Sequence, residues 1–439
     1  MLASIPPEPS RPAAGTARLG VLAPLGGCSS LGAGALAIAL DPAVESAHAT
    51  VVDPSADTDF ETGPSRPRPF WLLPWYGLVW LVRTVLSGLE WCFGLLALVA
   101  GLALLAAVPV LQFLSFGYLL EVSGRIARTG RLSEGLIGVR RAARVGSVVL
   151  GTWLFLLPLR YLATFERDAR LIDPTSPATQ WWTTFMTVIT VIVALHIVGA
   201  WARGGRLRHF LLPIINPLRV FRAVFRRGAY RDARDAVWEF VAALRLPYYF
   251  WLGLRGFVGG LLWLLVPVTM LATGRDAPVI GVLGALLMVL VALYLPLLQT
   301  HFAAQGRLRN MLALRAIRES FARAPLAWFL ALFGTLALAL PLYVLKIEMI
   351  PREVAWLPSL VFVLFMLPAR FLCGWAYARG NRREDASWRL VRWPLKVTLI
   401  PVAVIYVGFV YLTQFAAWDG IWSLYEQHAF LLPVPFNEM

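Results

Sequence analysis

The sequence has little charge and little cysteine. Charged residues make up 15% of the 439 residues, and hydrophobic residues make up 59%. A soluble globular domain carries about 25% charged residues, so this composition excludes an ordinary soluble enzyme, a disordered chain and a fibrous repeat. The mean hydropathy of +0.67 and the long apolar runs predict an all-α, polytopic integral membrane protein.

Residues that bind metals or form disulfides are sparse and scattered. Cys28, Cys92 and Cys373 form no CxxC pair, and the five histidines form no HExxH motif. Phosphate-binding loops and nucleophile elbows are also missing from the sequence. We therefore expect no metal, no cofactor and no catalytic residues, and we predict that the protein is not an enzyme.

Eight apolar stretches are long enough to cross about 30 Å of hydrocarbon as helices. They cover residues 89–111, 145–162, 183–202, 248–271, 279–298, 327–345, 357–377 and 397–417. An aromatic-rich segment, residues 70–82, precedes the first stretch and predicts an interfacial helix that leads into it.

Positive charge gathers in four of the loops between these stretches. Six, ten, five and six Lys plus Arg residues lie in residues 112–144, 203–247, 299–326 and 378–396. The intervening loops hold three or fewer, and the tail from residue 418 holds none. The positive-inside rule places the basic loops in the cytoplasm and both termini outside a bacterial plasma membrane. The net charge of +15 therefore indicates anionic inner-leaflet lipids as partners and not nucleic acid.

Residues 1–69 differ in composition from the rest of the chain. They are rich in Pro, Ala, Gly and Ser and contain one aromatic residue, Phe60. Ala47-His48-Ala49 has the shape of a signal-peptidase site, so this region is either a cleaved leader or a disordered extension, followed by an acidic linker over 50–69. The membrane domain then consists of a first half (70–271), a second half (279–417) and an outer interfacial tail (418–439).

Short matches between the two halves favour a parallel 4+4 duplication of the spans. Pro109 to Gln112 matches Pro296 to Gln299, Pro158 matches Pro341, and residues 199–206 match 374–382. On this hypothesis spans one to four correspond to spans five to eight, and the paired prolines are equivalent. Proline and small residues are common at the ends of membrane spans, so coincidence remains an alternative.

Arg255, Arg370 and His196 are titratable side chains inside the predicted spans, and Glu90 lies at the outer start of the first span. Either the two arginines reach the inner headgroups, or they line a site for an anionic headgroup or solute together with His196. No Asp or Glu falls deep in a predicted span, which disfavours a proton- or sodium-coupled transporter.

Two basic loop segments, the one after Asn216-Pro217 and residues 307–321, have an amphipathic pattern. After Asn216-Pro217, apolar residues share one helix face, and the opposite face carries Arg219, Arg222, Arg226 and Arg227. This pattern predicts a helix in the headgroup plane whose arginines contact anionic lipid. The alternative is a solvated basic loop that only fixes the topology. Near the C-terminus, Glu426 and His428 are either an acid–base pair or part of an aromatic interfacial segment.

One stretch resembles a known family. Gln112 to Arg125, with Gly117-Tyr118-Leu119 at its centre, is similar to the segment after the first span in a family of uncharacterised bacterial multi-pass membrane proteins. The resemblance is local. It implies a multi-pass membrane protein and carries no activity with it.

These observations favour a non-catalytic membrane protein, either a scaffold or a protein that interacts with anionic lipids. A transporter or permease for an anionic or amphiphilic solute is the alternative, favoured by the duplication and by Arg255 and Arg370. A membrane enzyme comes third, because it would require Glu426 and His428 to face a cleft.

Overall fold

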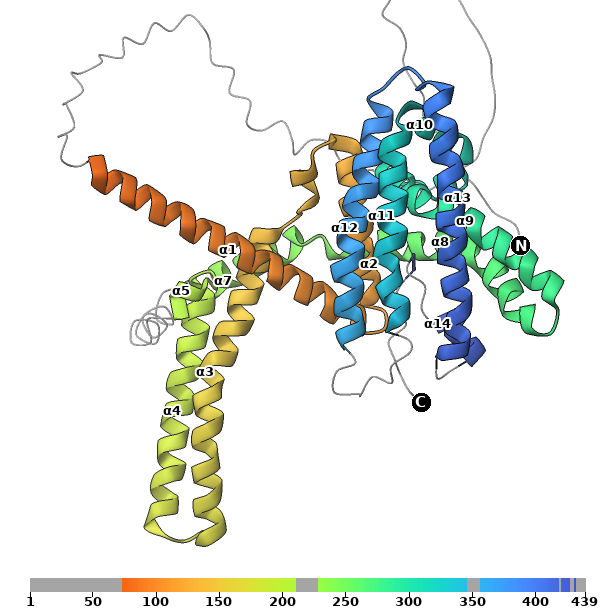
Figure 1. Ribbon diagram of the computed structural model, residues 1–439. Helices are drawn as coiled ribbons and strands as arrows, with labels where there is room; N and C mark the ends of the chain where they lie inside the picture. Colours follow the sequence, from red (N-terminus) through yellow and green to blue (C-terminus); the bar gives the residue numbers. More distant parts are fainter. Residues whose placement is uncertain (1–72, 211–227, 346–355, 418–419, 427–429, 432–439) are drawn as a thin grey trace, which may run out of the picture. The chain divides into compact units, whose positions relative to one another are not determined.

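The computed structural model describes residues 73–210, 228–345, 356–417, 420–426 and 430–431, and in this part of the chain every regular element is helical (Figure 1). Eight helices are long and apolar enough to span a membrane, which confirms the predicted all-α polytopic class. They belong to α1 (Leu73–Ala107), α3 (Val139–Ile172), α4 (Pro177–Ala202), α8 (Leu246–Ala272), α9 (Pro278–Gln305), α11 (Pro325–Val344), α12 (Trp356–Asn381) and α13 (Arg389–Ala416).

Shorter helices connect or flank these eight. They are α2 (Gln112–Thr129), η3 (Leu132–Gly135), α5 (Leu207–Phe210), α7 (Ala229–Ala243), η4 (Thr273–Arg275), η5 (Leu308–Leu312), α10 (Leu314–Arg323), η7 (Gly420–Trp422) and α14 (Ser423–Glu426). Residues 73–82 of the aromatic segment form the start of α1 and continue into the first span, and residues 70–72 lie outside the described residues.

The helix α2 is the largest departure from the sequence analysis. We expected residues 112–144 to form a basic loop, but residues 112–129 form a helix in which 12 of 18 residues are buried. α2 packs against α8, α9 and α12. Its charged residues lowered its hydropathy, and this is why a search for apolar spans missed it.

Glycine allows α2 and α8 to cross in backbone contact. A side chain at Gly117 would overlap the carbonyl oxygen of Tyr249, and a side chain at Gly253 would overlap that of Phe113. Small residues at helix crossings bring backbones together, and van der Waals packing then holds helices that both prefer an apolar solvent.

The helices α11, α12 and α13 complete the bundle around α2 and α9. Their inward faces bury large side chains, among them Phe362, Trp328 and Tyr406. The hydroxyl groups of Tyr343 and Tyr406 lie 2.9 Å apart inside the core, so that one hydroxyl donates a hydrogen bond to the other.

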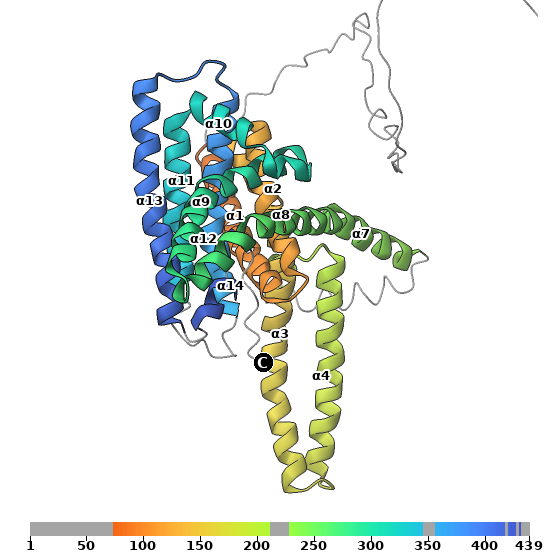
Figure 2. The same ribbon diagram turned by 90° about the vertical axis from the view of Figure 1, so that its right-hand side faces the viewer.

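The helices α3 and α4 form a long antiparallel hairpin, and both views show them side by side along their length (Figures 1 and 2). Only four of the 34 residues of α3 are buried. The hairpin makes its main contacts with the rest of the chain through α1 and α5. At its tip, Ser176 caps α4 by accepting a hydrogen bond from the Thr179 amide (3.2 Å), and Pro177 occupies the first turn.

The prolines of the predicted duplication do not all take equivalent positions. Pro158 lies inside α3, and Pro341 lies inside α11. Pro296 lies inside α9, whereas Pro109 lies in the turn between α1 and α2, where the chain leaves the helix. The match between Pro109 and Pro296 therefore does not correspond to a shared local structure.

Candidate functional site: a basic pocket between four helices

The three titratable residues that were predicted to form an anion site lie on three different helices. His196 is on α4, Arg255 on α8 and Arg370 on α12, and none of them lines the pockets described below. Arg255 is exposed on the surface of α8. His196 is buried, with its ring 4.2 Å from that of Phe155, which is an aromatic packing contact.

Arg370 is a buried cation in the middle of α12. Its side chain is 2% exposed, and its guanidinium carbon lies 5.6 Å from the centre of the Phe116 ring on α2. Its Nε has no hydrogen-bond partner among the described residues. A cation over an aromatic face is stabilised by the ring quadrupole, and this contact ties α12 to α2.

The remaining predicted sites are not described by the structure. Arg219, Arg222, Arg226 and Arg227 lie outside the described residues, and so does His428. Glu426 is the last residue of α14. No group of three or more potential metal ligands occurs within the described ranges.

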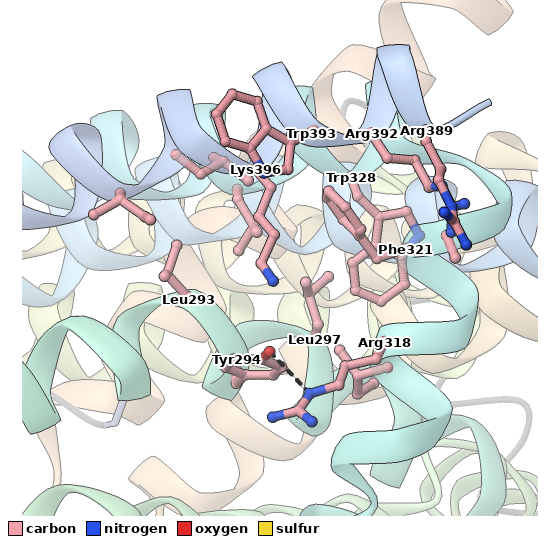
Figure 3. Close-up of a pocket in the computed structure, with 15 residues that line it drawn as sticks. Leu293, Tyr294, Leu297, Arg318, Phe321, Trp328, Arg389, Arg392, Trp393 and Lys396 are labelled. Atoms are coloured by element: carbon pink, nitrogen blue, oxygen red, sulfur yellow. Dashed lines mark hydrogen bonds between the residues drawn. The ribbon is translucent and has the colours of Figure 1, made fainter. Parts of the chain in front are cut away.

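A basic pocket of about 540 Å³ lies between α9, α10, α11 and α13 (Figure 3). Four positively charged residues line it, together with aromatic and aliphatic side chains. The cations are Arg318, Arg389, Arg392 and Lys396; the aromatic residues are Tyr294, Phe321, Trp328 and Trp393; the aliphatic residues include Leu293, Leu297, Leu332, Leu399 and Ile400.

Helix periodicity brings three of these cations together. Arg389, Arg392 and Lys396 are three and four residues apart at the start of α13, so they share one face of that helix. Arg318 reaches the pocket from α10, where its Nε donates a hydrogen bond to the Tyr294 hydroxyl (3.3 Å). Its guanidinium also lies over the Tyr294 ring, 5.9 Å from the ring centre.

No acidic residue lines this pocket, and its four cations are absent from the four ion pairs found among the described residues. Like charges gathered in one pocket repel each other, and an anion relieves that repulsion. The pocket is therefore electrostatically complementary to a negatively charged group.

The pocket becomes apolar with depth along α13. Arg389 stands at the start of the helix, and Leu399 and Ile400 follow ten and eleven residues later, about 15 Å further along the axis. Trp393 is 71% exposed near the charged end, a position that suits an aromatic side chain at the headgroup level. A charged end and an apolar end in one pocket match an amphiphile.

A second polar cluster joins α2 to α8. Glu121 is buried and accepts hydrogen bonds from Arg128 and from the Tyr248 hydroxyl (2.7 Å). Each carboxylate oxygen of Glu121 thus accepts one hydrogen bond, and the charge of Arg128 balances that of the carboxylate. The sequence predicted no acidic residue deep in a span, because residues 112–144 were expected to form a loop.

A third polar pocket lies where α2, α9 and α12 end. Arg128, Arg382 and Tyr377 line it, and Tyr377 is hydrogen-bonded to Nδ1 of the buried His301 (2.6 Å). Arg128 donates to the carbonyl oxygen of Ala303 (2.8 Å), and Arg382 donates to that of Thr129 (3.2 Å). Both arginines thus satisfy carbonyl groups at helix C-termini, so this pocket has a structural explanation.

Sequence reasoning missed the basic pocket because its walls are distant in the sequence. The spacing of Arg389, Arg392 and Lys396 was visible as one helix face. Nothing local indicated that Arg318 and Trp328 would stand opposite that face.

No family model, no curated protein and no solved structure matches this chain.

Proposed function

We propose that this multi-pass membrane protein is non-catalytic and holds an anionic amphiphile, a phospholipid of the cytoplasmic leaflet, in the basic pocket. The observation that supports this proposal is the set of four cations without an acidic neighbour above an apolar wall. Basic pockets between membrane helices on the cytoplasmic side recognise anionic lipid headgroups through the same chemistry.

The pocket lies at the membrane end that the charge distribution assigns to the cytoplasm. Its cations come from loops 299–326 and 378–396 and from the first turns of α13. We propose the bacterial plasma membrane as the location, with the basic loops in the cytoplasm and the C-terminus outside. A transporter for an amphiphilic solute has less support, because Arg255, Arg370 and His196 lie apart and do not line a common pocket.

Lipid retention tests the proposal. The full chain is purified in detergent, incubated with phosphatidylglycerol or phosphatidylcholine, and examined by native mass spectrometry for bound lipid. The variant Arg389→Gln/Arg392→Gln/Lys396→Gln removes three pocket cations. We expect its preference for phosphatidylglycerol to fall about tenfold or more, since each basic residue contributes about 1 kcal/mol near an anionic surface.

The matched control is Arg140→Gln/Arg206→Gln/Arg231→Gln, which removes three exposed arginines outside the pocket. It should keep the preference of the parent protein. An equal loss in both variants would show that only net charge matters and would refute the pocket as the binding site.

A further inference from the structure

We propose that α2 is a ninth membrane-crossing helix, so that α1 enters the membrane from the side of the basic loops. Counting eight apolar spans places the start of α1 outside, because that count treats residues 112–144 as one cytoplasmic loop. The packing of α2 and a repeat in the chain both indicate instead that the start of α1 lies on the cytoplasmic side.

The C-terminal end of α2 lies beside the C-terminal ends of α9 and α12. Arg128 donates to the carbonyl oxygen of Ala303 near the end of α9, and Arg382, just after α12, donates to that of Thr129. Both α9 and α12 lead into basic loops. The end of α2 therefore lies at the basic-loop side of the membrane.

The N-terminal end of α2 lies across the bilayer from there. Two contacts join α2 to α12: Phe116 lies against Arg370, and the Thr129 carbonyl accepts from Arg382. The two contacts are 13 residues apart on α2 and 12 residues apart along α12 and the residue that follows it. The helices α2 and α12 thus run parallel and in register, and Figure 1 shows both of them following the same direction. Eighteen helical residues span about 27 Å, close to the hydrocarbon thickness of about 30 Å.

The charges of α2 are compatible with this depth. Arg125 and Arg128 lie in its last two turns, within reach of the headgroups. Glu121 lies deeper and is paired with Arg128 and Tyr248. A charged residue inside a membrane normally faces protein and has a partner, and this one has both.

A repeat of 176 residues supports the same conclusion independently. Gly130-Arg131-Leu132 after α2 recurs as Gly306-Arg307-Leu308 after α9. Both glycines have a left-handed backbone conformation, with φ of +69° and +72°. The N–H of each donates a hydrogen bond of 2.7 Å to the carbonyl oxygen four residues earlier. In both places an extended arginine and a 3-10 helix follow.

The same offset aligns a second match. Ala200-Trp-Ala-Arg-Gly-Gly-Arg206 at the end of α4 corresponds to Ala376-Tyr-Ala-Arg-Gly-Asn-Arg382 at the end of α12, again 176 residues later. One shift therefore pairs α2 with α9 and α4 with α12. By chain order it also pairs α1 with α8 and α3 with α11.

This register fixes the direction of α1. α8 follows the basic loop 203–247, so it enters from the basic side, and its counterpart α1 does the same. In this register the membrane domain consists of two units of four helices each, followed by α13, which has no counterpart. The first unit contains α1, α2, α3 and α4, and the second contains α8, α9, α11 and α12. The C-terminus stays outside, and Leu73 lies on the cytoplasmic side.

Cysteine accessibility decides between the two topologies. A new cysteine replaces Arg83, ten residues into α1, or Val110 in the α1–α2 turn, both exposed. The full chain also carries Cys28→Ser, Cys92→Ser and Cys373→Ala, so that each variant has a single cysteine. Right-side-out vesicles are treated with a membrane-impermeant maleimide before and after permeabilisation. We expect Val110→Cys to react in intact vesicles and Arg83→Cys to react only after permeabilisation.

Eight spans with an outside N-terminus require the reverse pattern at both positions, and either reversal would overturn the proposal. A Val110 cysteine that stays unlabelled from outside would overturn the crossing by α2. Two controls behave alike in both topologies: Thr175→Cys reacts in intact vesicles, and Ser133→Cys reacts only after permeabilisation. These controls also show that the variants have inserted correctly.

Discussion

The helix α2 and the α3–α4 hairpin show opposite relations between sequence and surroundings. The hairpin is apolar enough to be found by hydropathy, yet only four of the 34 residues of α3 are buried in protein. α2 carries three charged residues and escapes the same search, yet two thirds of it is buried. Apolar sequence therefore marks the helices that face lipid, whereas glycine and paired charges mark a helix enclosed by other helices.

The two regions are also held together differently. α2 contacts neighbouring backbones through Gly117 and through hydrogen bonds to residues far along the chain. The hairpin depends on local contacts between its two helices and on hydrogen bonds at its tip. Substitutions should therefore have large, global effects in the first region and small, local effects in the second.

The largest effect is expected at the crossing of α2 and α8. Gly117→Ala and Gly253→Ala place a methyl group against a backbone carbonyl, which cannot move aside as a side chain can. Overpacking costs about 1–3 kcal/mol, and more where the backbone must shift. We expect each variant to lose most of its monodisperse fraction in size-exclusion chromatography and to unfold at a lower temperature.

Gly101→Ala and Gly408→Ala are matched controls, because nothing lies within 4 Å of a methyl group at either position. Alanine at an open helical glycine should be neutral or stabilising by up to about 1 kcal/mol. Comparable destabilisation in the controls would show that the crossing is not special.

An intermediate effect is expected from the two ion pairs, one in each region. Glu121→Gln leaves Arg128 without its carboxylate partner next to the bundle core, a loss of about 1–3 kcal/mol. Glu166→Gln breaks an i,i+4 pair with Arg170 on the hairpin, worth about 0.3–0.5 kcal/mol. Chemical unfolding in mixed micelles measures both, and equal effects would contradict the contrast between the regions.

The smallest effect is expected at the tip of the hairpin. Asp173 accepts hydrogen bonds from the amide (2.9 Å) and hydroxyl (2.8 Å) of Thr175, and these bonds hold the pKa of its carboxyl below the usual value. A lowered pKa in the folded state means that the stabilisation is present above the unfolded pKa of about 3.9 and is lost as pH falls through the folded pKa.

Pepsin, which works in this acidic range, can probe the tip. Because the activity of pepsin itself changes with pH, cleavage in the bundle serves as the reference. We expect the ratio of cleavage near Asp173 to cleavage in the bundle to increase as the pH falls below about 4. Asp173→Asn should remove the pH dependence at the tip. A pH dependence that persists in this variant would assign it to another group.

The sequence predicted the lipid-facing part of the fold better than the protein-facing part. The eight apolar helices occur where expected, because hydropathy reports directly on contact with hydrocarbon. α2 was missed because Glu121 and Arg128 cancel each other only when folded. The basic pocket was half visible, in the spacing on α13, but Arg318 joins it only through tertiary packing.

The burial of α2 also constrains the order in which the chain is assembled during synthesis. A helix with Glu121, Arg125 and Arg128 is a poor substrate for insertion alone, and the partners that enclose it are made much later. The carbonyl that Arg128 binds lies 175 residues on, and Arg382 lies 253 residues beyond Thr129. At about 5–20 residues per second, the ribosome needs about 13–50 s to supply that last partner. During that interval α2 is an unfinished segment, and a chain truncated before α12 would present it permanently to the cell's proteases.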